Sequence, residues 1–180
     1  HAMRLPVVIA ALLATSAFAG QEPSLNVTPP KELAKVDFFL GKWEGTEKML
    51  DAMGKSVTAK ATMVGTKAIG DMFFQTTHVA DLGKTGKMQS MHLISYDIFK
   101  RKFTAFWFDS SSPGVTEMSG GFQGNKLIMI SKPKEFPGIA LPLIMRFTWQ
   151  RLPQNKLSFL LEMQAGDKWQ TVIDGSFKKV

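Results

Sequence analysis

The chain has 180 residues, a formal net charge of +7 and no cysteine. This length is typical of one domain with its own core, and the lack of cysteine excludes disulfides and thiolate metal or redox sites. The lysines are scattered singly rather than gathered into a stripe, so we interpret the charge as a solvated exterior and expect no nucleic-acid partner.

The first residues predict a secretory signal peptide. Met3 and Arg4 give a charged start, residues 5–14 are uncharged and apolar, and an A-x-A cleavage site ends at Ala19. The apolar run is shorter than the roughly 20 residues of a transmembrane helix, so we do not expect an integral membrane protein.

The chain is therefore divided into three parts. Residues 1–19 comprise the signal peptide, preceded by His1 and Ala2, which are interpreted as the remnant of an expression tag. Residues 20–30 are polar and contain proline, as in a linker. We expect residues 31–180 to form a periplasmic or secreted domain.

One short helix is predicted over residues 31–40. Its apolar residues recur at spacings of three and four, which is typical of an amphipathic helix. Thr28 is a candidate N-cap, and Gly41 is expected to end the helix.

The rest of the chain predicts short strands separated by turns. The expected strands are residues 43–50, 57–68, 72–80, 87–96, 102–109, 115–122, 126–131, 143–151, 156–164 and 169–177. Successive hairpins of this kind predict an all-β fold, an antiparallel up-and-down barrel of about ten strands with one N-terminal helix. Bulky residues lie on both faces of residues 103–108, so we expect the outer face to be covered by the helix or by a second subunit in a homodimer.

Two segments resemble a known group. The run Asp37-Phe38-Phe39-Leu40-Gly41-Lys42-Trp43-Glu44-Gly45, and later Ser95-Tyr96-Asp97 with Phe106-Trp107-Phe108-Asp109, resemble lipocalin-like exported bacterial proteins of unknown function. The resemblance implies a closed barrel with an internal cavity. Apart from the resemblance, the glycines beside Trp43 favour an indole that plugs one barrel end, with a ligand contact as the alternative.

Nitrobindins are distantly similar to this group and hold haem through a histidine late in the chain. The last histidine here is His92, and the segment after Trp43 lacks the extra glycine of the nitrobindin motif. We therefore predict no haem and no other cofactor.

His78 and His92 lie on neighbouring predicted strands. If the numbers of opposite residues sum to about 170, the two histidines face each other on one side of the sheet. They are candidates for polar contacts in a cavity, and ordinary hydrogen-bonded residues are the alternative. A metal needs a third ligand, and no carboxylate stands at a suitable spacing, so no metal site is predicted.

No catalytic residues are predicted. Asp97 is expected to cap the backbone of its own turn, and the serines after Asp109 lack a nucleophile elbow and a suitably placed histidine. For Arg146 there are two interpretations. Its side chain either points inward and binds a ligand carboxylate, or points outward as a solvated charge. The outward direction is favoured, because Arg146 alternates with the apolar residues of its strand.

The long apolar loop over residues 132–142 is the preferred place for a site. Phe136, Ile139 and Leu141 would cover the barrel mouth, and Trp107 is a further candidate for the cavity. The alternative is a loop that lies on the surface and covers the side of the barrel. The sequence thus predicts an exported, non-enzymatic protein that holds a small apolar ligand in a barrel cavity. The alternative is a structural or protein-interaction module of the cell envelope without such a ligand.

Overall fold

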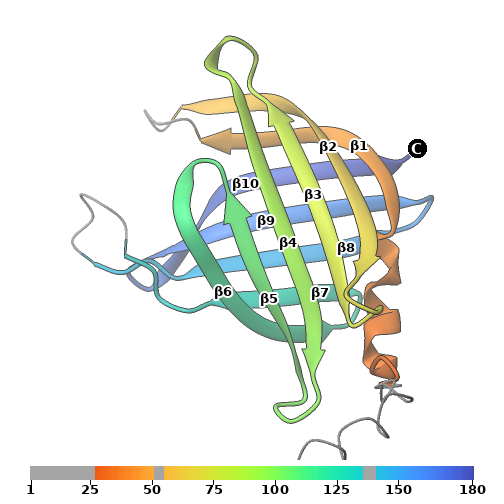
Figure 1. Ribbon diagram of the computed structural model, residues 1–180. Helices are drawn as coiled ribbons and strands as arrows, with labels where there is room; N and C mark the ends of the chain where they lie inside the picture. The colour runs from red at the N-terminus through yellow and green to blue at the C-terminus, as the bar shows by residue number, and fades with distance from the viewer. Residues whose placement is uncertain (1–26, 51–54, 136–140) are drawn as a thin grey trace, which may run out of the picture.

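A computed structural model describes residues 27–50, 55–135 and 141–180, which fold into a closed antiparallel barrel (Figure 1). Each strand pairs with its neighbours in sequence, and β1 closes the barrel against β10. The strands are β1 (Gly41–Leu50), β2 (Ser56–Ala68), β3 (Phe73–Asp81), β4 (Lys87–Asp97), β5 (Lys102–Asp109), β6 (Ser112–Gln123), β7 (Lys126–Ser131), β8 (Met145–Leu152), β9 (Lys156–Ala165) and β10 (Lys168–Lys179).

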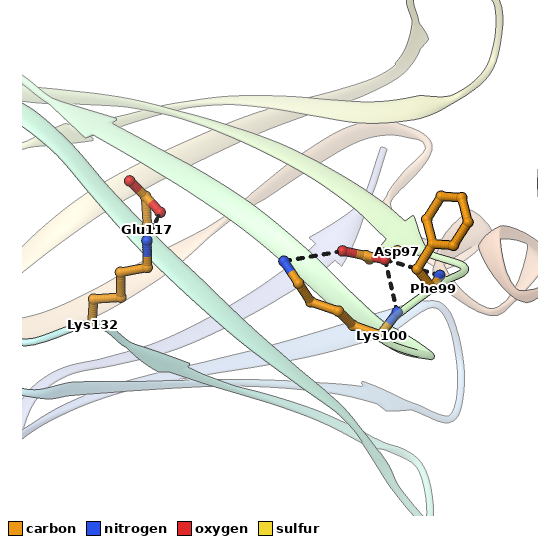
Figure 2. A network of polar contacts seen from close by, with 5 residues as sticks. All are labelled: Asp97, Phe99, Lys100, Glu117 and Lys132. Carbon is orange, nitrogen blue, oxygen red and sulfur yellow. Dashed lines mark hydrogen bonds and ion pairs between the residues drawn. The ribbon is translucent and has the colours of Figure 1, made fainter.

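The prediction of a ten-stranded up-and-down barrel with one N-terminal helix is confirmed. The predicted strand boundaries agree to within about three residues. Asp97 caps the β4–β5 turn as expected, because its carboxylate accepts the backbone N–H groups of Phe99 and Lys100 at 3.0 and 2.9 Å (Figure 2). These bonds, the one from the Lys100 backbone first among them, lower the pKa of Asp97.

The N-terminal helix differs from the prediction in type and in its cap. It is a 3₁₀ helix, η1 (Lys31–Phe39), and its buried residues are Leu33, Val36 and Phe39. A spacing of three fits the three residues per turn of a 3₁₀ helix, so this geometry aligns all three side chains on the barrel. Thr28 is not the N-cap: Pro30 takes that position, without a side-chain hydrogen bond.

Helix η1 closes one end of the barrel (Figure 1). Gly65 of β2 lies so close to it that a Cβ atom at this position would stand 1.9 Å from the Phe39 carbonyl oxygen. The same carbonyl accepts the indole N–H of Trp43 at 3.1 Å, within the buried core. Trp43 therefore plugs this end, as the sequence predicted, because it is tied to the last residue of the helix.

The interior above η1 is packed with aromatic side chains. Trp149 stacks on Phe159 with ring centroids 4.1 Å apart, and Phe39 meets Trp149 edge to face at 5.2 Å. Phe147 and Trp107 continue the cluster, with centroids 5.2 Å apart. The half of the barrel next to η1 is therefore filled by aromatic side chains, and Phe147 and Trp107 mark its boundary with the other half.

Helix η1 does not cover the outer face of β5. The prediction that the helix covers this face is therefore wrong. Phe106 and Phe108 point outward from β5 and keep 36 % and 37 % of their surface exposed. Met91 and Leu93 stand beside them on β4. The structure thus leaves an apolar strip on the wall of the barrel.

A substitution at Gly65 tests the closed end. Gly65→Ala places a methyl group against the Phe39 carbonyl, so we expect a loss of about 3 kcal/mol in the free energy of unfolding, at the upper end of overpacking effects. Urea denaturation measures this loss. Gly121→Ala is the matched control, because a Cβ at this strand position meets nothing within 4 Å. Equal stability of the two variants would contradict the close contact.

Candidate functional site

A cavity of about 630 Å³ lies at the barrel end opposite η1. The ends of several strands form this cavity. The last residues of β1 and the first residues of β4 and β8 belong to its lining. Its volume lies within the range of small-molecule sites. The apolar part of its lining is Met49, Leu50, Val57, Leu82, Met88, Trp107, Met145, Phe147, Leu161, Met163, Val172 and Ile173.

The rim of the cavity is polar, and Asp109 organises one side of it. The Asp109 carboxylate accepts the indole N–H of Trp107 at 3.0 Å. It also accepts the backbone N–H of Ser111 at 2.9 Å and the Ser111 hydroxyl. These three donors fix Trp107 as a wall of the cavity and engage both carboxylate oxygens within the protein.

Lys134 and Thr116 form the other polar part of the wall. The Lys134 ammonium donates to the Thr116 hydroxyl at 3.2 Å, and both residues line the cavity. The backbone of Lys134 pairs with that of Leu143 through two hydrogen bonds of 2.9 and 2.8 Å. This bridge holds a half-buried positive charge at the cavity wall.

A second polar group lies deeper in the barrel. His78 Nδ1 stands 3.2 Å from the Ser90 hydroxyl, and His92 Nδ1 stands 3.3 Å from the Thr76 hydroxyl. His78 Nε2 lies 3.2 Å from a carboxylate oxygen of Glu47, whose side chain is 1 % exposed. The two groups are close enough for an ion pair, although they are not aligned as a hydrogen bond. We call these five residues the buried polar layer.

The register of β3 and β4 corrects the predicted facing of the histidines. His78 is opposite Ser90 and His92 is opposite Thr76, so opposite numbers sum to 168 rather than about 170. Because the difference is two residues, both side chains still point inward, but they stand diagonally instead of face to face.

The buried polar layer has a chemically suggestive order. Ser90, His78 and Glu47 place a hydroxyl, an imidazole and a carboxylate in series, as nucleophilic enzymes do. Ser90 is 8 % exposed and does not belong to the cavity lining. The series therefore supports the wall of the barrel from within and offers no nucleophile to the cavity.

Glycine makes room for the buried carboxylate. Gly175 of β10 is opposite Glu47, and a Cβ there would stand 3.3 Å from a carboxylate oxygen and 3.0 Å from the Phe177 ring. A larger residue at this position would push Glu47 away from His78. The position of the polar layer thus depends on sequence far along the chain.

His92 has a strongly perturbed environment. Its ring centroid lies 3.9 Å from that of Trp107 and 6.0 Å from that of Phe147, and both of these aromatic residues line the cavity. Burial lowers the pKa of His92 well below its ordinary value of 6.5, and the neighbouring His78 lowers it further. His92 is therefore a neutral imidazole directly beneath the cavity floor at neutral pH.

The structure separates the residues that the sequence proposed for the cavity. Trp107 lines it, His78 and His92 lie below it, and Trp43 lies at the closed end. Leu141 is 74 % exposed and is not part of the lining. Phe136 and Ile139 fall outside the described residues.

Arg146 points outward, as the alternation of its strand favoured. Its guanidinium donates to both carboxylate oxygens of Glu162, at 2.7 and 2.8 Å, and lies 4.3 Å from the ring centroid of Trp169. The hydrogen bonds to Glu162 raise the pKa of Arg146. Arg146 thus braces the outer wall, and the ligand-carboxylate role is wrong for this residue.

The sequence analysis proposed no role in a site for Glu47, Thr116 or Lys134. Glu47 shares the parity of Trp43 in β1, so strand alternation alone placed a carboxylate inside. Lys134 lies in the loop over residues 132–142 that the sequence favoured for a site, whereas Thr116 carried no local signal, because only the folded barrel brings it beside Lys134.

In the described ranges, no three or more histidine, aspartate or glutamate side chains are arranged to hold a metal. The described cavity lining includes no histidine, so the residues present do not fit a haem that needs an axial imidazole there. Of the helices that the structure describes, none has the length and apolar character to cross a membrane.

Comparison with known proteins places the chain in a family. The family model "Protein of unknown function (DUF1579)" matches residues 28–179, which include all of the barrel. The chain belongs to the DUF1579 family. No curated protein matches the sequence significantly.

A solved structure shares the fold of this DUF1579 protein. Rv2717c from M. tuberculosis superimposes with a TM-score of 0.61 and 14 % sequence identity, over 85 % of this chain and 99 % of that one. At this identity the likeness concerns the fold alone. It shows that the barrel architecture occurs in an experimentally determined protein.

The buried His92 predicts how stability depends on pH. The unfolded state takes up a proton as the pH falls through 6.5, whereas the native state does not. The neutral His92 imidazole therefore makes its full contribution to the free energy of unfolding above that pH, and this contribution falls as the pH drops below it. The loss is about 1.4 kcal/mol between about pH 7.5 and about pH 5.5. Urea denaturation at both values should show that His92→Gln removes this part of the loss. An unchanged pH dependence in the variant would contradict the neutral, buried imidazole.

Proposed function

We propose that this protein is an exported, non-enzymatic binding protein that holds a small apolar ligand in the cavity at the mouth of its barrel. The observation that carries the proposal is the cavity of about 630 Å³, whose floor is formed by Trp107, Phe147, Leu161 and Ile173. Apolar surface of this kind gains roughly 25 cal/mol for each Å² that a ligand removes from water.

Two features of the barrel support a pre-formed site. Trp107 is held by its hydrogen bond to Asp109, so the wall does not need to be ordered when a ligand enters. Four methionines surround the space, and their flexible thioethers adapt to ligands of different shape. The resemblance to lipocalin-like proteins is in keeping with this function.

Export rests on the signal-peptide pattern of residues 1–19. The described domain suits an oxidising compartment, since its chain has no cysteine to be oxidised and is stabilised by packing alone. We therefore propose a periplasmic or secreted location for the protein.

A neutral fluorescent probe tests the cavity. N-phenyl-1-naphthylamine, whose emission rises in apolar surroundings, is expected to bind the wild-type protein. Met88→Trp fills the cavity and should weaken binding about tenfold or more, because the indole occupies the ligand's space. Met91→Trp is the matched control, three residues along β4 on the outer face, and should bind as wild type does.

The result that would contradict the proposal is equal binding by Met88→Trp and wild type. Failure of the wild-type protein to bind this probe and other apolar molecules of similar size would argue against the cavity as a ligand site. Thermal unfolding of both variants confirms that each is folded before binding is compared.

The apolar strip on the outer wall favours a second candidate function, that of a protein-interaction module. Phe106 and Phe108 are more than one-third exposed beside Met91 and Leu93. A homodimer in solution that dissociates on Phe106→Ser would support this function, and a monomer at all concentrations would count against a dimer through this face.

A further inference from the structure

The polar groups at the cavity rim are unequal in what they offer a ligand. The Asp109 carboxylate already accepts three hydrogen bonds, from Trp107 Nε1 and from the backbone and hydroxyl of Ser111. The Ser110 hydroxyl accepts the backbone N–H of Gln89 at 3.0 Å, which leaves its own hydrogen to donate. The Asp109 carboxylate is thus engaged by donors of the protein, and the Ser110 hydroxyl keeps a hydrogen that it can donate.

Positive charge also lies at the cavity wall. The Lys134 ammonium is positioned by the Thr116 hydroxyl at 3.2 Å and by the backbone bridge from Lys134 to Leu143. Lys87 is a second lysine in the lining, although its ammonium stands 3.7 Å from Asp81 and is largely exposed. The half-buried Lys134 is therefore the cation whose field is least screened by solvent.

We infer that the ligand is an amphipathic anion, an apolar molecule with one carboxylate, whose head group binds Lys134 at the rim while its tail lies against Trp107 and Phe147. This inference rests on the proposed function and adds the chemical class of the ligand. A charge-assisted hydrogen bond from an ammonium to a carboxylate is stronger than one to a neutral group.

The opposite classes of ligand fit less well. A cationic amphiphile would place its charge beside Lys134 and find Asp109 occupied by protein donors. A neutral alcohol would fill the apolar floor equally well but would gain only an ordinary hydrogen bond. The buried carboxylate of Glu47 does not alter this preference, because it lies outside the cavity lining.

The test compares three probes with the same chain: dodecanoate, dodecanol and dodecylamine. Their affinities are measured by displacement of N-phenyl-1-naphthylamine at about pH 8, below their critical micelle concentrations. Dodecanoate should bind about tenfold more tightly than dodecanol, and dodecylamine should bind most weakly.

Two lysine variants locate the effect. Lys134→Gln should lower the affinity for dodecanoate about tenfold and leave that for dodecanol nearly unchanged. Lys132→Gln removes the same charge two residues away, where the ammonium is paired with Glu117 (Figure 2), and should bind both probes as wild type does. The comparison separates a direct contact from the general charge of the protein.

The outcomes distinguish the inference from the proposed function. If dodecanol binds as tightly as dodecanoate to wild type, the cavity holds apolar ligands but the carboxylate preference is wrong. If the preference survives Lys134→Gln, or is lost equally in Lys132→Gln, the assignment to Lys134 is wrong. If none of the three probes displaces the dye and the dye itself does not bind, the proposed function fails as well.

Discussion

The contact between the Phe39 carbonyl and Gly65 fixes which end of the barrel is closed by η1. A backbone oxygen of η1 occupies the place of a side chain on β2, and the Trp43 indole donates to the same oxygen. Helix, first strand and second strand are thereby joined at one point. This end is filled by Trp43, Phe39 and Trp149, whereas the cavity of about 630 Å³ lies at the other end.

Between the two ends, the interior changes character in layers along the strands. Aromatic residues pack above η1, the buried polar layer follows, and the apolar cavity lies beyond it. The polar layer is costly to bury, and Gly175 and the cross-strand serine and threonine are the local features that accommodate it. Its effect is to fix the inner side chains of β1, β3 and β4 beneath Trp107, so that the cavity floor is rigid rather than fluid.

The barrel was predictable because its signals are local. Turn residues recur at short intervals, and successive side chains of a strand alternate between its two faces, so ten strands and the placement of His78 and His92 on one face of the sheet followed from neighbouring residues alone. The type of the helix was missed, since Leu33, Val36 and Phe39 suit a period of three as well as they suit a helical stripe. The histidine register was missed by two residues because η2 (Gly83–Thr85) and its C-cap Gly86 set the hairpin, which the sequence pattern left open.

The cavity itself was only partly predictable, for a physical reason. Lys134, Thr116 and Met88 line one cavity because the barrel closes, and their distance in sequence leaves no periodic trace. Trp107 was found because it lies in an aromatic strand. Arg146 was a fair candidate by residue type, yet Glu162 on β9 and Trp169 on β10 hold it on the outside.

The chain's four tryptophans provide the most direct measurement of the central claim, that the ligand occupies the mouth of the barrel. Trp43 lies at the closed end, Trp149 in the core, Trp169 beside Arg146 on the outer wall, and Trp107 in the cavity. In a ¹⁵N–¹H correlation spectrum, titration with dodecanoate should shift the Trp107 indole signal most and leave those of Trp43 and Trp169 in place. The largest shift at Trp43 or Trp169, or none at Trp107 on saturation, would contradict the account.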